Sequence, residues 1–94
     1  MKKISSSTDL ARQLGITSSR GVEATMKAQL IGAVLREVSR QHLTHAELAE
    51  RTGLPRSAVT GILSGSLQKI TIDRVLRLVG AVGLEAEVKI RRAA

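Results

Sequence analysis

Residues 44–65 read THAELAERTGLPRSAVTGILSG, and this stretch contains the start and stop signals of two short helices. Thr44 and Glu47 have the spacing of a capping box, in which the threonine hydroxyl accepts a hydrogen bond from the Glu47 amide and the glutamate carboxylate accepts one from the Thr44 amide. The first helix therefore begins here. It is expected to end at Gly53, because the left-handed backbone that stops a helix favours glycine. Pro55 suits the first position of the second helix, where its missing N–H group would have no intrahelical acceptor.

The second helix is expected to run to about Leu63 and to end at the Ser64-Gly65-Ser66 turn. Small and apolar residues fall where two tightly crossed helices need them. Ala49 is small at the closest approach of the helices, and Gly53 makes the sharp turn between them. The apolar side chains expected to fill the space between the helices are Leu48, Leu54, Val59 and Ile62. These offsets predict a helix-turn-helix, with an ordinary helical hairpin as the alternative.

The solvent-facing side of the second helix carries polar side chains near its start, namely Arg56, Ser57 and Thr60. Such positions reach base edges when the second helix of a helix-turn-helix enters the major groove. Arg56 can donate two hydrogen bonds to O6 and N7 of guanine, a pairing worth about 1–3 kcal/mol of base discrimination. The alternative role for Arg56 is a phosphate contact or a solvated side chain.

Phosphate contacts are expected on either side of these base-reading positions. His45 lies at the start of the first helix, where the side chain and the helix dipole act together on an anion. The polar and basic residues after the second helix are Ser64, Ser66, Gln68 and Lys69. We expect this group to contact the DNA backbone, although any single member would also fit a hydrated loop.

The composition favours nucleic acid as the partner. The chain has 94 residues, enough for one compact domain, and its 15 Lys and Arg against 8 Asp and Glu give a formal charge of +7. A membrane surface is the competing anionic partner, but no apolar run approaches the roughly 20 residues that span a bilayer, and no aromatic residue anchors an interfacial helix. Proteins that bind single strands or specific RNA sequences usually stack bases on aromatic rings. Because this chain has no aromatic residue, double-stranded DNA is the expected partner.

Other functional classes find less support in the sequence. The absence of cysteine excludes disulfides and thiolate metal sites, and it fits a cytoplasmic location. His42, His45 and Glu47 lack a further ligand at a suitable spacing, so no metal site is expected. No nucleophile, base and orienting group converge in the sequence pattern, so we expect no catalytic residues, no cofactor and no enzyme activity.

The N-terminal part of the chain is expected to differ from the rest. Residues 1–21 are predicted to form a flexible arm with a short helix from Asp9 to Leu14, and residues 22–94 the DNA-binding domain. A long amphipathic helix is predicted from Val22 to His42. Its apolar residues recur every four positions and are expected in the core: Val22, Met26, Leu30, Val34 and Val38, flanked by Ile31 and Leu35.

The C-terminal part begins with a helix that Thr71 caps and Gly83 ends. Beyond it the period becomes two, as in a half-buried strand: Leu84, Ala86, Val88 and Ile90 alternate with Glu85, Glu87, Lys89 and Arg91. One strand is not stable alone. Its partner is either the Lys2–Ile4 segment or, as we favour, the same strand of a second subunit in an antiparallel ribbon. The predicted fold is all-α, with five helices and a short C-terminal strand that pairs across a homodimer.

The sequence between Leu30 and Leu84 resembles the lambda-repressor/Cro-like (Xre) helix-turn-helix family. The resemblance rests on LTHAELAERTGLPRSAVTGILSG and on the helix from Thr71 to Leu84. Within that superfamily the chain is most similar to the short HigA-type antitoxins, on the RQLG lead-in, on KAQL in the long helix and on the terminal strand from Glu85 to Arg91. Two positions depart from the family pattern. His45 replaces the usual glutamine, and Gly61 stands where a long polar side chain is common.

The resemblance implies a dimeric operator-binding protein that represses its own operon and neutralises a ribosome-dependent RNase toxin. Two alternatives stay open. One is a stand-alone Xre-family or phage-type regulator without a toxin partner. The other is an antitoxin that works mainly by protein binding, which the N-terminal portion, residues 1–26, would serve.

Overall fold

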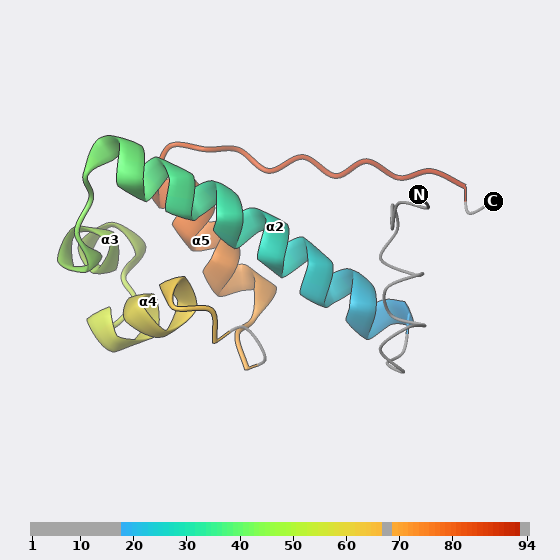
Figure 1. Ribbon diagram of the computed structural model, residues 1–94, viewed down its shortest axis with the longest axis horizontal. Coiled ribbons are helices and arrows are strands. Elements are labelled where there is room, and N and C mark those ends of the chain that lie inside the picture. Colours follow the sequence, from blue (N-terminus) through green and yellow to red (C-terminus); the bar gives the residue numbers. More distant parts are fainter. Residues whose placement is uncertain (1–17, 67–68, 93–94) are drawn as a thin grey trace, which may run out of the picture.

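The computed structural model describes residues 18–66 and 69–92, and over these ranges the chain forms four helices and no strand. The helices are α2 (Ser18–Gln41), α3 (His45–Thr52), α4 (Arg56–Leu63) and α5 (Ile72–Ala81). Figure 1 shows α2 as a long rod, with α3, α4 and α5 gathered against its C-terminal half. The short helix predicted from Asp9 to Leu14 and most of the predicted arm lie outside the described residues. The predicted division between residues 21 and 22 falls inside α2.

A single hydrophobic core joins all four helices. The buried side chains are Ile31, Val34, Leu48, Leu54, Val59, Ile62, Val75, Leu78, Val79 and Val82. They come from α2, α3, α4 and α5, from the turn between α3 and α4, and from the residue directly after α5. The helix-turn-helix is therefore not a free-standing pair of helices, because its inner face is covered by α2 and α5.

The core-facing stripe of α2 differs from the predicted one. Val22, Met26 and Leu35 were expected in the core but are exposed, at 36%, 40% and 42%, whereas Ile31 and Val34 are buried as predicted. A four-residue spacing overshoots a helical turn by about 40° at each step, so residues spaced in this way drift around the helix. Lys27, one turn before Ile31, is buried, and its ammonium nitrogen lies 2.8 Å from a Glu23 carboxylate oxygen.

The helix ends follow the glycine signals with one exception. Gly53, Gly65 and Gly83 all have positive φ at the ends of α3, α4 and α5. His42 also has a positive φ, 55°, directly after α2. The His42 amide donates to the Ser39 carbonyl, and the following amide donates to a carbonyl five residues back, as in a Schellman motif. His42 therefore occupies a position that a Cβ atom makes unfavourable.

The start of α4 differs from the prediction by one residue. Pro55 has ψ 144° and so precedes the helix, which begins at Arg56. The Pro55 carbonyl accepts hydrogen bonds from the amides of Ala58 and Val59, at 3.0 and 3.1 Å. The proline thus serves as the capping residue of α4 and is not its first helical residue.

The predicted C-terminal strand does not form within the single chain. After α5 the chain continues as an extended segment without a strand partner among the described residues (Figure 1). Val88 and Ile90 are 73% and 91% exposed. Leu84 differs from the other residues assigned to dimerisation, because it packs against the chain's own core. A strand requires a neighbour for its amides and carbonyls, and one copy of the described chain supplies none.

Two long side chains hold the C-terminal end of α5 in place. Gln41 donates from Nε2 to the Val82 carbonyl at 2.9 Å, and Arg51 donates from Nη1 to the Ala81 carbonyl at 3.0 Å. These carbonyls are at a helix end, where no intrahelical amide is available. The bonds tie α2 and α3 to the same end of α5.

Glu37 organises the surface of α2 near Gln41. Its carboxylate accepts from Arg40 Nε and Nη2, at 2.7 and 2.9 Å, and from Gln41 Nε2 at 3.2 Å. The hydrogen bond from Arg40 lowers the pKa of the Glu37 carboxyl below its usual value. The contribution of this Glu37–Arg40 pair to stability is therefore present at neutral pH and is lost as the pH falls through the lowered pKa.

None of the helices in the described ranges has the length and apolarity required to cross a membrane.

Replacing His42 by Gly is expected to raise the free energy of unfolding by about 0.5–1 kcal/mol, because relief of the left-handed strain outweighs the chain entropy that glycine loses. Urea denaturation of the full chain measures this. His42→Ala is the matched control, since it keeps a Cβ atom at the strained position. Equal stability of the two variants would contradict the assignment of strain to His42.

Candidate nucleic-acid interface

The orientation of α4 is set by side chains buried between it and α3. Leu48 on α3 and Val59 on α4 are completely buried, and Ile62 is 2% exposed. Leu54, in the turn, is 7% exposed. All four residues predicted to fill the space between the helices are therefore in the core, and Ala49 packs against it.

The start of α3 is fixed by the predicted capping box. The Glu47 amide donates to Thr44 Oγ1 at 3.1 Å, and the Thr44 amide donates to Glu47 Oε1, also at 3.1 Å. The carboxylate of Glu47 is thus engaged with the helix end. This places His45 at the first position of α3, beside the free amides of its first turn.

Thr52 stabilises the turn between α3 and α4. Its hydroxyl donates to the Leu48 carbonyl at 2.7 Å and accepts from the Leu54 amide at 3.2 Å. The Gly53 amide donates to the Ala49 carbonyl at 2.9 Å, with Gly53 at φ 75°. Sequence reasoning did not assign a role to Thr52. The signal available in the sequence is a threonine directly before the turn glycine.

The predicted base-reading residues lie on the outward side of α4. Arg56, Ser57 and Thr60 are all exposed, whereas Val59 and Ile62 on the same helix are buried. Arg56 and Thr60 are four residues apart and so share one face. Gly61 adjoins this face, and a Cβ atom there would meet nothing within 4 Å. The outward face of α4 is therefore polar, with one position that has no side chain.

A hydrogen bond connects α3 to this outward face. His45 Nδ1 lies 2.8 Å from Thr60 Oγ1, and the two residues are fifteen positions apart in the sequence. The sequence placed His45 among the phosphate contacts and Thr60 among the base contacts, and the structure brings them together. The bond fixes the position of the Thr60 hydroxyl, and it leaves Nε2 of the imidazole available to a further partner.

The residues predicted to contact phosphate after α4 differ in their availability. The Ser64 hydroxyl donates to the carbonyls of Thr60 and Gly61, at 2.9 and 3.1 Å, so its proton is used within the helix. Ser66 and Lys69 are exposed. Gln68 lies outside the described residues.

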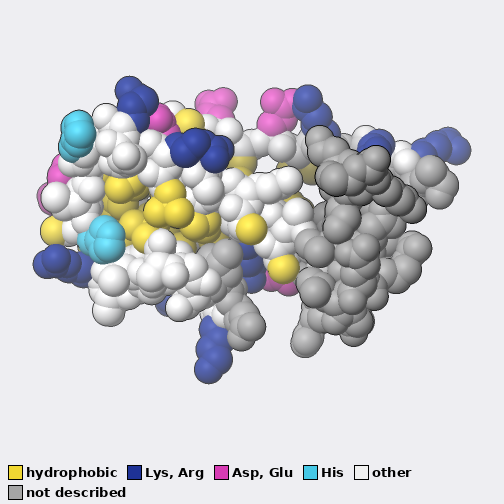
Figure 2. Space-filling view, viewed as in Figure 1, with side chains coloured by type: hydrophobic (Ala, Val, Ile, Leu, Met, Phe, Trp, Pro, Cys, Tyr) yellow, Lys and Arg dark blue, Asp and Glu magenta, His cyan; other side chains and the backbone are white. Residues whose placement is uncertain are grey.

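The positive charge of the chain lies mostly outside the helix-turn-helix. Between residues 44 and 66 the acidic Glu47 and Glu50 are matched by Arg51 and Arg56. Figure 2 shows Lys and Arg side chains projecting from several edges of the face in view, with apolar side chains gathered between the helices. The excess charge therefore lies in the parts of the sequence that flank the motif, and the net positive charge of the chain would attract a polyanion over a distance.

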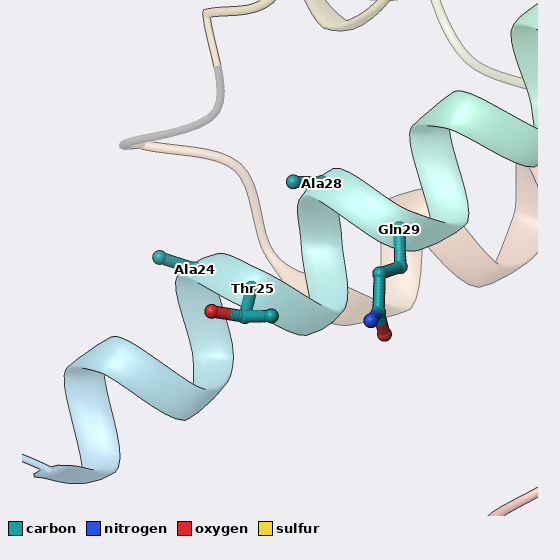
Figure 3. Close-up of a pocket in the computed structure, with 4 residues that line it drawn as sticks. All are labelled: Ala24, Thr25, Ala28 and Gln29. Carbon is teal, nitrogen blue, oxygen red and sulfur yellow. The ribbon is translucent and has the colours of Figure 1, made fainter. Parts of the chain in front are cut away.

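A hollow away from this surface offers little chemistry for binding. A shallow hollow lies on α2, lined by Ala24, Thr25, Ala28 and Gln29 (Figure 3). All four residues come from one side of one helix and offer no charged group. Within the described ranges, no three His, Asp or Glu side chains are close enough together to hold a metal ion.

Two short helices crossed over a buried contact, with the second presented outward, define a helix-turn-helix of the kind that binds DNA. The profile of the family described as "Helix-turn-helix domain" matches residues 16–91, so the chain belongs to that family. The match runs from just before α2 to the extended C-terminal segment, and so covers all four helices. Comparison with curated proteins and with solved structures found no match in either.

Leu48→Ala is expected to lower the free energy of unfolding by about 2–5 kcal/mol, because it opens a cavity under α4. Arg56→Ala is the matched surface change and is expected to alter the free energy of unfolding by less than about 0.5 kcal/mol. Chemical denaturation of both variants measures the difference. A large loss of stability in Arg56→Ala would mean that its side chain is packed inside, which is incompatible with an outward reading face.

Proposed function

We propose that the protein is a sequence-specific regulator of transcription that inserts α4 into the major groove of double-stranded operator DNA. The observation that carries this proposal is the exposed row of Arg56, Ser57 and Thr60 on a helix whose opposite side is locked into the core. A helix held in this way can meet base edges without reorganising, which reduces the entropy lost on binding.

Base reading is assigned to the outward face of α4. Arg56 donates two hydrogen bonds to O6 and N7 of a guanine. Ser57 and Thr60 contact neighbouring base edges, and Thr60 is held for this by the 2.8 Å bond to His45. His45 thereby connects phosphate binding at the start of α3 with base reading on α4.

Phosphate binding is assigned to groups on both sides of α4. His45 and the free amides at the start of α3 form one clamp. Ser66, Lys69 and Gln68 form the other, and Ser64 joins it once its hydroxyl turns away from the helix carbonyls. Two clamps fix the register of α4 along the groove, and the net positive charge of the chain increases the rate of encounter.

We further propose that the regulator is a homodimeric repressor. Two subunits would place their α4 helices in successive major grooves, about 34 Å apart, on a pseudo-palindromic operator. Occupancy of the operator would exclude RNA polymerase from the promoter.

The HigA-type resemblance extends the proposal to an antitoxin that also neutralises an RNase toxin. Support in the chain comes from α2, where Val22 and Met26 are exposed and play no part in the helix-turn-helix core. The alternative is a stand-alone regulator. Co-expression with an RNase encoded beside this gene discriminates between them, because an antitoxin restores growth and a stand-alone regulator does not.

Arg56→Ala and Lys69→Ala are expected to weaken DNA binding in different ways. Loss of Arg56 removes a contact to one base and should cost about 1–3 kcal/mol on the preferred operator while relaxing the preference at one position of each half-site. Loss of Lys69 removes a phosphate contact and should weaken binding to all sequences alike. Fluorescence anisotropy with an operator library measures both.

The same titrations give the salt dependence of binding. Affinity should fall roughly tenfold to a thousandfold between 50 and 200 mM salt if several phosphates are contacted. Binding that is independent of salt would contradict the proposal. Equal losses from Arg56→Ala and Lys69→Ala on every sequence would refute the assignment of base reading to Arg56.

Gly61→Ala is expected to stabilise the fold but weaken DNA binding. Glycine inside a helix costs roughly 0.5–1 kcal/mol relative to alanine, and a Cβ at Gly61 meets no atom of the chain within 4 Å. A methyl group pressed into a close contact with DNA costs about 1–3 kcal/mol, so binding should weaken by about five- to 150-fold.

Gly80→Ala is the matched control for this substitution. Gly80 is an exposed glycine of α5, and a Cβ atom there would also meet nothing within 4 Å. In the proposed mode of binding α4 enters the groove and α5 does not, so Gly80 should not contact DNA. It should stabilise the fold without changing the affinity for DNA. If Gly61→Ala also leaves the affinity unchanged, the backbone of α4 does not approach DNA at this position.

A further inference from the structure

The C-terminal segment carries two different rows of side chains on an exposed stretch of chain. Residues 85–92 are exposed throughout, and Val88 and Ile90 reach 73% and 91%. In an extended chain alternate side chains point to opposite sides. One row therefore carries the apolar Ala86, Val88 and Ile90 and ends in Arg92. The other is charged, and consists of Glu85, Glu87, Lys89 and Arg91.

The charged row is arranged symmetrically about Val88. Its two acidic residues come first and its two basic residues follow. If two copies of the segment run antiparallel with Val88 opposite Val88, Glu87 lies opposite Lys89 and Glu85 lies opposite Arg91. Each of these two pairings occurs twice, because the two strands are identical. The ribbon therefore has four cross-strand pairs of opposite charge.

Registers centred on a charged residue bring like charges together. With Glu87 at the centre it faces its own copy, and with Lys89 at the centre that lysine faces its own copy. A parallel arrangement in register places every charge opposite the same charge. Like charges directly opposite each other destabilise a strand pair.

Registers centred on the other apolar residues are also unfavourable. With Ala86 at the centre the two acidic residues face each other, and with Ile90 at the centre the two basic residues do. A slip by one residue turns the apolar row of one strand to the charged side of the other. Among residues 85–91, only the register centred on Val88 gives every charged residue a partner of opposite sign.

We propose that residues 85–91 of two copies of this chain pair as an antiparallel ribbon centred on Val88. The apolar row fits this register as well as the charged row does. Val88 meets its own copy on the two-fold axis, and the small Ala86 lies opposite the large Ile90. The partner of the exposed segment is thus the same segment of a second copy of the chain. The contact is isologous, because both copies use the same residues.

The ion pairs select the register more than they strengthen the contact, because solvent-exposed ion pairs contribute little free energy. A two-stranded ribbon is only marginally stable in water. Association is therefore expected to be weak, dependent on concentration and weakened by salt. The biological role of the ribbon rests on the proposed function, because paired half-sites on DNA require two subunits. The register of the ribbon follows from residues 85–91 alone.

Single cysteines test the register directly, because the chain contains no cysteine of its own. Val88→Cys should form a disulfide-linked dimer under mild oxidation. Ala86→Cys and Ile90→Cys should not, because each of these residues lies four positions, about 13 Å, from its own copy along the ribbon, and a disulfide cannot bridge Cα atoms more than about 7 Å apart. A mixture of the Ala86→Cys and Ile90→Cys chains should cross-link.

Other cross-linking patterns would overturn the proposal. The strongest cross-link in Glu87→Cys or Lys89→Cys would indicate a different register. Equal cross-linking at every position, or none at Val88→Cys, would mean that no ordered ribbon forms. Circular dichroism of each variant checks that the helices, which the segment does not build, are intact.

Charge reversal gives a second test by sedimentation. One variant combines Glu85→Lys with Glu87→Lys, and the other combines Lys89→Glu with Arg91→Glu. Each alone places like charges opposite each other and should sediment as a monomer. Mixed together they should form a heterodimer, since every pair is again of opposite sign. A mixture that associates no better than its components would refute the pairing.

DNA binding by the oxidised Val88→Cys dimer separates the two proposals. A cross-linked dimer that binds no duplex would contradict the proposed function and leave the ribbon intact. Duplex binding by a chain that does not cross-link at Val88 would contradict the ribbon alone.

Discussion

The orientation of α4 depends on the apolar contact that it shares with α3. Leu48 and Val59 are completely buried there, and Ile62 nearly so. Truncating a buried Leu or Val lowers the free energy of unfolding by several kcal/mol. This contact therefore represents a large share of the stability of a small domain. Because the contact involves one side of α4, the opposite side is presented to solvent in a fixed direction. The polar row that we assign to DNA is a consequence of that packing.

The contact is itself supported by the rest of the molecule. α2 and α5 cover the inner side of the helix-turn-helix, and Gln41 and Arg51 tie the end of α5 to α2 and α3. The motif is thus held on two sides and does not need DNA to order it. The C-terminal segment is the contrasting case. It leaves the core after Leu84, and its apolar row has no cover within one copy of the described chain.

Local signals in the sequence predicted most of the motif. The capping box at Thr44, the turn at Gly53 and the outward row on α4 follow from spacing alone, because each depends on residues within one or two turns of helix. Arg51 was missed because its acceptor is a backbone carbonyl thirty residues away. The bond between His45 and Thr60 was missed for the same reason, since it crosses two helices. The strand prediction depended on a partner that the described residues of one chain do not supply.

Amide NMR titration of the full chain with a DNA duplex at low salt tests the central claim most directly, since it reports on every element at once and does not require the operator to be known. The account predicts that the largest changes in chemical shift occur at the start of α3, along α4 and in the turn that follows it. Changes confined to α2, α5 and the C-terminal segment, with α4 unaffected, would contradict it.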